Sequence, residues 1–238
     1  MIRIKKIQQI LKEISNVAKI LSERGWAEAN AGNISFNVSD AIGDEFDCSN
    51  LQKSSKDYGF SKDISIIITS SGSRMREVAK SPEKYCGVLT FLAGNKGYYI
   101  SKFGEEEFIP TSEYLSHVMI HRELANENRS EKAIIHTHPD ELIAAMHLNE
   151  LNTEEKINSV FNRMHSEFSM LIPNKVGYIP FTDPGSKKLA EETLKKLEDH
   201  KIVLWKDHGC LSIGDSLDSA LDIIEIVNKI SMVYLLQK

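Results

Sequence analysis

Apolar residues recur every three or four positions between Ile4 and Leu21, and polar or charged residues occupy the positions between them. This spacing is typical of an amphipathic helix that packs one face against a core. Helix starts are also predicted after Pro110 and at Pro139, because proline and acidic residues favour the first turn of a helix. The same apolar spacing predicts further helices over 153–165, 185–199 and 217–236.

Short apolar runs and alternating segments predict the strands. Residues 34–38 alternate strictly between apolar and polar, which indicates a half-buried strand. The apolar runs at 64–69 and 133–137 indicate strands that are buried on both sides. A β-hairpin at the Gly94–Gly97 turn and further strands are predicted at 87–93, 97–101, 168–172, 176–181, 202–205 and 210–213. The polar stretch 40–62 predicts a long surface excursion.

Helices and strands interleave along the chain, and the hairpin adds antiparallel neighbours. We therefore expect an α/β fold, a three-layer α/β/α sandwich with a mixed, mostly antiparallel central sheet. No repeat, low-complexity segment or linker divides the sequence. A single domain over residues 1–238 is predicted.

Composition excludes several classes of function. The net charge of -5 disfavours nucleic-acid binding, which normally needs a basic surface. No segment approaches the roughly 20 apolar residues of a membrane helix, so no membrane role is expected. Cys48, Cys86 and Cys210 are far apart and form no metal-binding pair or disulfide framework. They are expected to be free thiols in a reducing compartment, and the N-terminus has no signal sequence, so we predict a cytoplasmic protein.

The sequence His136-Thr137-His138 ends a predicted strand. Residues two apart in a strand point to the same face, so both imidazoles can reach one cation. Imidazole nitrogens suit zinc or a similar transition metal, although two histidines can also merely solvate a strand end. His208 lies in a predicted tight turn between two short strands and is a candidate third ligand. Three protein ligands would leave a coordination position open for substrate.

The remaining histidines fit a metal site less well. His117 and His121 are four residues apart on a predicted helix, but no H-E-x-x-H glutamate lies between them. Surface or capping roles are therefore expected for this pair. His147, His165 and His200 are expected to be solvated.

Glu113 follows Thr111 and Ser112 at a predicted helix start. This pattern is consistent with helix capping. It is also consistent with a carboxylate general base beside hydroxyl and backbone N–H groups that bind an anion.

Two further loops are rich in small hydrogen-bond donors. They contain Asn30, Gly32 and Asn33 before one strand, and Ser71 and Gly72 after another. Such loops let backbone N–H groups close on a phosphate, although each alone is also ordinary turn chemistry. Three loops of this kind together with a histidine pair and a candidate third ligand favour an enzyme that binds a phosphorylated substrate.

At these positions the sequence resembles the class II aldolase/adducin family, zinc enzymes that cleave or isomerise sugar phosphates. The motifs that carry the resemblance occur in the family's order along nearly the whole chain: Trp26-Ala27-Glu28-Ala29-Asn30-Ala31-Gly32-Asn33-Ile34-Ser35, Thr69-Ser70-Ser71-Gly72-Ser73, Pro110-Thr111-Ser112-Glu113, His136-Thr137-His138 and His208-Gly209. Within the family, the likeness is greatest to the members that act on L-rhamnulose 1-phosphate.

The resemblance implies retro-aldol cleavage to dihydroxyacetone phosphate and L-lactaldehyde, in a C4 homotetramer with active sites between subunits. It implies one Zn²⁺ per subunit, bound by His136, His138 and His208. Glu113 would handle the proton at the dihydroxyacetone carbon, and Glu167 would act on the lactaldehyde oxygen of a neighbouring subunit. The residues implied to bind the phosphate are Asn30, Gly32, Asn33, Ser71, Gly72, Thr111 and Ser112.

Other activities of this scaffold stay open at the level of sequence. They are cleavage of L-fuculose 1-phosphate, 4-epimerisation of a pentulose phosphate and dehydration of methylthioribulose phosphate. A metal-free interaction module like adducin is also a member of the family. The presence of all three histidines and of Glu113 argues against such a module, because a binding domain has no chemical use for them.

Overall fold

A long mixed β-sheet organises the chain, whose computed structural model describes residues 2–42, 51–94, 96–104 and 107–238. Within these residues, nine strands lie in the order β2-β5-β4-β3-β1-β6-β9-β8-β7. Their bounds are β1 Asn33–Asn37, β2 Leu51–Asp57, β3 Ile64–Thr69, β4 Cys86–Phe91, β5 Lys96–Lys102, β6 Ala133–Thr137, β7 Gly177–Ile179, β8 Ile202–Trp205 and β9 Gly209–Gly214. Neighbouring strands are antiparallel except for β7 and β8, which are parallel. The predicted mixed, mostly antiparallel sheet is confirmed.

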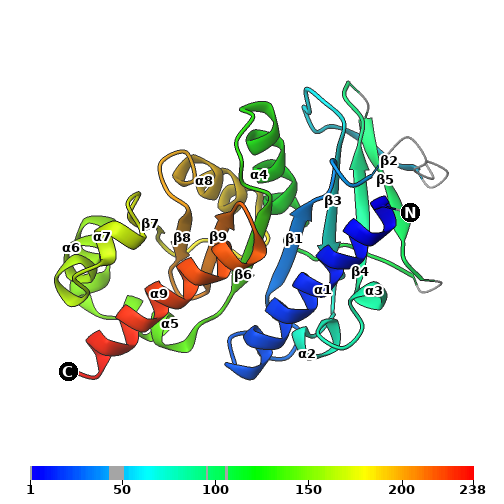
Figure 1. Cartoon of the computed structure of the whole chain (residues 1–238). Helices are drawn as coiled ribbons and strands as arrows, with labels where there is room; N and C mark the ends of the chain where they lie inside the picture. Colours follow the sequence, from blue (N-terminus) through cyan, green and yellow to red (C-terminus); the bar gives the residue numbers. More distant parts are fainter. Residues whose placement is uncertain (1, 43–50, 95, 105–106) are drawn as a thin grey trace.

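Helices cover both faces of this sheet (Figure 1). Helices α1 and α9 lie on one face together with α2, α5, α6 and α7, and α4 and α8 lie on the other. Their bounds are α1 Ile2–Glu23, α2 Met75–Val78, α3 Pro82–Tyr85, α4 Tyr114–Asn126, α5 Asp140–Met146, α6 Glu154–Met164, α7 Phe168–Leu171, α8 Lys187–Lys196 and α9 Leu217–Leu235, with a 3₁₀ turn at Asn149–Leu151. None of the described helices is both long enough and apolar enough to cross a membrane.

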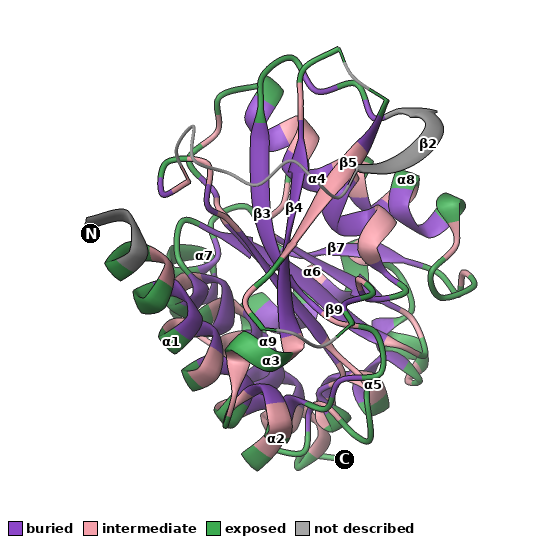
Figure 2. Cartoon of the chain, turned by 90° about the vertical axis from the view of Figure 1, so that its right-hand side faces the viewer, coloured by how far each residue is buried: buried purple, intermediate pink, exposed green. Residues whose placement is uncertain are grey.

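Strand β6 illustrates why the sequences of the central strands are continuously apolar. Ile135 packs into the core beneath α1 and α9, whereas Ile134 packs into the core beneath α4 and α8. Figure 2 shows the central strands buried and the exposed residues gathered on the outer surfaces of the helices. Because side chains alternate along a strand, His136 points to the same side as Ile134, toward α4 and α8.

Two predictions about the elements of the fold are wrong. The segment 168–172 was expected as a strand, but α7 is a helix in which Phe168 and Ile172 are buried and Met170 and Leu171 are exposed. Burial of residues four apart is the pattern of one helical turn, and the Phe168 ring packs edge-on to Phe161 of α6 at 5.8 Å between centroids.

The segment 40–62 is also not entirely a surface excursion. It contains β2, which pairs with β5 at the edge of the sheet, where a strand needs no apolar run to form its backbone hydrogen bonds. Residues 43–50, and with them Cys48, lie outside the described residues. Cys86 and Cys210 are buried free thiols, as predicted.

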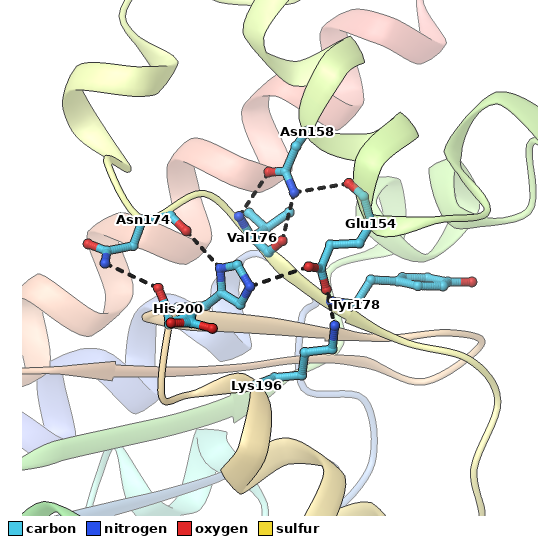
Figure 3. A network of polar contacts seen from close by, with 8 residues as sticks. Glu154, Asn158, Asn174, Val176, Tyr178, Lys196 and His200 are labelled. Carbon is cyan, nitrogen blue, oxygen red and sulfur yellow. Dashed lines mark hydrogen bonds and ion pairs between the residues drawn. The ribbon is translucent and has the colours of Figure 1, made fainter.

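A polar network ties α6 to β7 and α8 (Figure 3). The Glu154 carboxylate accepts a hydrogen bond from the backbone N–H of Tyr178 at 2.9 Å and another from the Lys196 ammonium. The Asn158 amide donates to the carbonyl of Val176 at 2.8 Å and accepts from its N–H at 2.9 Å. These contacts replace backbone pairing at the outer side of the short strand β7.

Candidate metal and active site

The ends of two neighbouring strands bring three histidines together. His136 lies in β6, His138 is the first residue after β6, and His208 lies in the turn between β8 and β9. Strands β6 and β9 are antiparallel neighbours, with Thr137 opposite Cys210, so the end of β6 meets the start of β9. One ring nitrogen from each histidine lies within 4.8 Å of the others. The structure therefore brings the three predicted metal ligands into one group.

The turn that carries His208 depends on a glycine beside it. Gly209 has φ +153°, and a Cβ there would lie 2.4 Å from the carbonyl oxygen of Thr137 and 3.0 Å from the His138 ring. No other residue allows this approach without displacing backbone. Asp207, the residue before His208, adopts φ +61°, which completes the tight turn. The backbone of this turn therefore places His208 close to the end of β6.

Hydrogen bonds at the outer nitrogens orient two of the rings. His136 donates through Nδ1 to the carbonyl of Cys210 at 2.9 Å, and the Glu28 carboxylate accepts from Nδ1 of His138 at 3.0 Å. A neutral imidazole that donates through Nδ1 carries its lone pair on Nε2. The two Nε2 atoms lie 3.1 Å apart, so two lone pairs face each other. Such outer contacts are typical of histidines that bind metal.

This donor set fits a transition-metal cation. Facing lone pairs repel unless a cation lies between them, and two nitrogens of a tetrahedral zinc site lie about 3.3 Å apart. Burial and the neighbouring histidines lower the pKa of His136 well below its usual value. Burial and His138 lower the pKa of His208 to about 4. Both rings are therefore neutral near pH 7, the form that binds a metal.

Glu113 lies just before the first residue of α4 and is 7% exposed. Burial raises the pKa of its carboxyl to about 7, and the backbone N–H of Gly185 opposes this shift. Its Oε2 atom is buried without a hydrogen-bond partner among the described residues. The Glu113 side chain makes no capping bond, whereas the Thr111 hydroxyl accepts from the backbone N–H of Glu113 at 3.4 Å. A carboxyl with a pKa near neutrality can both accept and release a proton.

The first predicted phosphate loop borders the histidines. Asn33 begins β1 directly opposite His136 of β6, so their side chains share one face of the sheet. Gly32 has φ +77°, and a Cβ there would lie 3.2 Å from the carbonyl oxygen of His136. Asn30 is exposed in the turn before these residues. This loop therefore lies at the same end of the sheet as the histidine group.

The other two predicted loops run side by side at this end. The N–H of Ser71 donates to the carbonyl of Ile109 at 2.7 Å, and the N–H of Thr111 donates to the carbonyl of Thr69 at 3.1 Å. The Thr69 hydroxyl in turn accepts from the N–H of Ile34 in β1 at 3.2 Å. The structure thus joins all three loops through β1 and β3. Of the residues predicted here, Thr111 is buried, whereas the exposed ones are Ser71, Gly72 and Ser112.

Glu167 is exposed immediately before α7. Within the described part of the chain, its side chain has no hydrogen bond or ion pair, and the metal-ligand group contains only the three histidines. A single chain therefore leaves the predicted role of Glu167 untested.

The positions of His117 and His121 differ most from the prediction made from the sequence. Both were expected in surface or capping roles, yet both are 0% exposed on the buried face of α4. Ser35 of β1 bonds to both rings, and Nε2 of His117 lies 2.5 Å from Oδ1 of Asn33. The signal was present, because His117 and His121 continue at helical spacing into the buried Leu124.

The other histidines differ in exposure. His147 is 58% exposed, as predicted, and its Nε2 lies 3.4 Å from Asp207. His165 is half-buried. His200 was expected to be solvated but is 13% exposed, because its Nδ1 donates to the carbonyl of Asn174 at 2.7 Å and its Nε2 faces Glu154 (Figure 3).

Comparison with known proteins identifies the family. A family model described as "Class II Aldolase and Adducin N-terminal domain" matches residues 12–235. The chain belongs to this family. As a class II aldolase, it is an enzyme of the lyase class, and class II aldolases depend on a metal ion.

Relatives and solved structures agree with the assignment. Over 236 residues the chain is 32% identical to a rhamnulose-1-phosphate aldolase of Bacteroides thetaiotaomicron, covering 96% of this chain and 87% of that one. The rhamnulose-1-phosphate aldolase of Listeria monocytogenes is 26% identical, over 94% of this chain and 83% of its own length. The crystal structure of a sugar-phosphate aldolase from Thermotoga maritima superposes with a TM-score of 0.80 at 32% identity, covering 97% of this chain and 95% of that one.

An L-fuculose 1-phosphate aldolase structure has a TM-score of 0.63 at 20% identity, covering 96% of this chain and 86% of that one. At that identity the likeness shows the shared aldolase fold alone.

Proposed function

We propose that this class II aldolase cleaves L-rhamnulose 1-phosphate to dihydroxyacetone phosphate and L-lactaldehyde, with Zn²⁺ as its metal. The observation that carries the proposal is the histidine group, in which the Nε2 atoms of His136 and His138 face each other at 3.1 Å. Relatives named for rhamnulose 1-phosphate over most of both chains support the choice of substrate. A sugar phosphate is charged and does not cross membranes unaided, so the cytoplasm is the compartment that we propose.

His136, His138 and His208 would hold the cation through their ring nitrogens. When bound, it supplies a positive charge that stabilises the negative charge developing on the substrate oxygens beside the cleaved bond, which is worth several kcal/mol. The chain fixes the rings in advance through the carbonyl of Cys210 and the carboxylate of Glu28. Little reorganisation is then needed when substrate arrives.

Glu113 moves the proton. Its unpaired Oε2 atom gives a proton to the dihydroxyacetone carbon during cleavage and takes it back in the reverse, condensing direction. Burial keeps the pKa of this carboxyl at about 7, so both protonation states are accessible near neutral pH. A positioned acid or base of this kind contributes about 10²- to 10⁴-fold to the rate.

The three loops bind the phosphate group. Their hydroxyl and backbone N–H groups are neutral donors, which suits a dianion on a chain whose net charge is -5. Because the phosphate is remote from the cleaved bond, its binding energy serves to position the reacting carbons. The residues in this role are Asn30, Gly32, Asn33, Ser71, Gly72, Thr111 and Ser112.

We further propose that residues 1–238 act as a single domain within a C4 homotetramer, in which Glu167 reaches the lactaldehyde oxygen of a neighbouring subunit. Met170 and Leu171 follow Glu167 and are 70% and 42% exposed, which supports a subunit contact there. Glu167→Ala should slow cleavage about tenfold and leave metal content and oligomeric mass unchanged, as measured by steady-state kinetics, elemental analysis and light scattering. Unchanged kinetics would contradict the role of Glu167.

The substrate is tested by offering the purified enzyme L-rhamnulose 1-phosphate, L-fuculose 1-phosphate and L-ribulose 5-phosphate in parallel. Released dihydroxyacetone phosphate is coupled to NADH oxidation, and elemental analysis gives the bound metal. We expect the highest kcat/KM with L-rhamnulose 1-phosphate and about one zinc per chain. No release from either deoxyhexulose phosphate would overturn the proposal, and a metal-free, inactive protein would favour an interaction module.

A further inference from the structure

A row of buried polar side chains lies between α4 and β1, behind the histidine group. Ser35 in the middle of β1 is 0% exposed, and so are His117 and His121, one turn apart on α4. The Ser35 hydroxyl lies 2.6 Å from Nδ1 of His117 and 2.8 Å from Nε2 of His121. Nε2 of His117 lies 2.5 Å from Oδ1 of Asn33. The row therefore ends on a residue that the proposed function assigns to phosphate binding.

The direction of these hydrogen bonds follows from the groups themselves. The amide oxygen of Asn33 only accepts, so His117 donates to it through Nε2–H. Burial lowers the pKa of both histidines to about 3, and His117 adds to the effect at His121, so each ring carries a single proton. Nδ1 of His117 must then accept from the Ser35 hydroxyl, and the Ser35 oxygen accepts from Nε2–H of His121.

The far end of the row agrees with this direction. It leaves Nδ1 of His121 as a bare lone pair, and this atom is buried without a partner in the described part of the chain. The reverse direction would place an unpaired N–H at the same buried position, and orphaned buried donors are rare in proteins. The row is therefore directed from His121 through Ser35 and His117 to Asn33.

We infer that Ser35, His117 and His121 are positioning residues that hold the Asn33 amide with its NH₂ group toward the phosphate. This inference rests on the proposed function of Asn33. With Oδ1 fixed on His117, the amide turns Nδ2 away from α4, and Nδ2 has no partner among the described residues and is not one of the fully buried unpaired atoms. A rotated amide would instead present an oxygen to an anion, which repels it.

The row also explains why two histidines are buried so close to the metal site without belonging to it. Asn33 lies opposite His136, so a displacement of its side chain occurs on the same face as the reacting groups. A neutral histidine can donate through one ring nitrogen and accept through the other. The rings of α4 can therefore fix the direction of the hydrogen bonds up to Asn33 of β1 without adding charge beside the cation.

The test removes the middle of the row and compares it with a matched serine outside it. Ser65 of β3 is buried like Ser35, and its hydroxyl bonds to Thr90 at 2.8 Å, with no link to the site. Ser35→Ala should raise the KM for substrate and the Kd for inorganic phosphate about tenfold to hundredfold, with a smaller change in kcat and unchanged metal content. Ser65→Ala should leave all four quantities unchanged.

A second measurement does not depend on any variant folding. Nitrogen-15 NMR of the histidine-labelled holoenzyme should show His117 and His121 both neutral and both protonated at Nε2. An Nδ1-protonated His117, or phosphate affinity in Ser35→Ala equal to that of the wild type, would overturn the inference.

Asn33→Ala separates the inference from the proposed function. We expect it to weaken phosphate binding at least as much as Ser35→Ala. Loss of affinity in Asn33→Ala but not in Ser35→Ala rejects the directed row and keeps the function. Unchanged affinity in Asn33→Ala rejects the role of Asn33, and with it the inference.

Discussion

Two polar networks in this enzyme join a helix to the sheet, and they differ in how completely their atoms are paired. In the network of Glu154, carboxylate, ammonium, imidazole and amide groups all find partners (Figure 3). In the region of the histidine group and α4, three buried atoms lack partners among the described residues: Glu113 Oε2, His208 Nδ1 and His121 Nδ1. The first network is complete, and the second is open.

This difference in pairing distinguishes a network that stabilises the fold from a region that serves the reaction. An unpaired buried polar atom costs about 1–3 kcal/mol, so a region that holds several of them is poor at stabilising the fold. A functional site is one place where such atoms persist, which fits Glu113 Oε2, whereas Nδ1 of His121 is the end of the directed row. The remaining atom of this kind, Nδ1 of His165, lies outside both networks and the structure gives it no role.

The pKa values of Glu113 and Glu154 shift in opposite directions. Burial raises the pKa of Glu113 to about 7. Burial alone would also raise the pKa of Glu154, but hydrogen bonds from Lys196 and from the N–H of Tyr178 outweigh it and lower the pKa. One carboxyl is therefore prepared to exchange a proton, and the other is held as a carboxylate.

The largest effect is expected from the open region. His136→Ala should abolish stoichiometric metal binding and reduce turnover by about 10³-fold or more, because two histidines hold the cation weakly and the charge of the metal is lost. Elemental analysis and steady-state kinetics measure both. His200→Gln, in the complete network, is the matched histidine control and should keep metal and turnover. Equal metal content in the two variants would contradict the assignment of the ligands.

Glu113→Gln should keep the metal and lower turnover by about 10²- to 10⁴-fold, because the amide cannot carry the proton. The glutamine has almost the same shape, so packing should be preserved. Metal content and thermal unfolding serve as controls in the same samples. Normal turnover would show that another group moves the proton.

The stability of the metal-free enzyme should depend on Glu113 in a defined direction. A folded-state pKa of about 7, above the usual 4.5, favours the protonated fold. This contribution is complete below pH 4.5 and is lost as the pH rises through 7, by up to about 3 kcal/mol. Urea unfolding of wild type and Glu113→Gln across this range measures it as the difference between the two curves. Parallel curves would mean that the carboxyl is not buried in the metal-free fold.

The complete network should show a smaller effect of opposite sign. Because the pKa of Glu154 is lowered, its contribution is present above the unfolded-state pKa and is lost as the pH falls. Glu154→Gln should lower the free energy of unfolding at pH 7 by about 1–2 kcal/mol and leave kcat unchanged. Urea unfolding and kinetics measure the two quantities, and a large loss of kcat would break the contrast between the networks.

Much of the fold was predictable because its signals are local. The long helices α1 and α9 and the strands β1, β3 and β6 follow from apolar spacing within each segment. Local spacing failed at α7, where two buried positions four residues apart fit either structure. It also failed at β2, whose pairing with β5 at the sheet edge needs no apolar pattern.

For the site, the sequence by itself determined that His136 and His138 share a face, since alternation along a strand is a property of the backbone. Motifs in order along the chain placed it in its family and supplied His208, Glu113 and the loops proposed to bind phosphate. Only the tertiary structure decided that His117 and His121 are buried and joined through Ser35 to Asn33, because burial depends on which surface α4 covers. The pKa of Glu113 and the facing nitrogens of the histidines were likewise set by packing between segments distant in sequence, which local pattern does not encode.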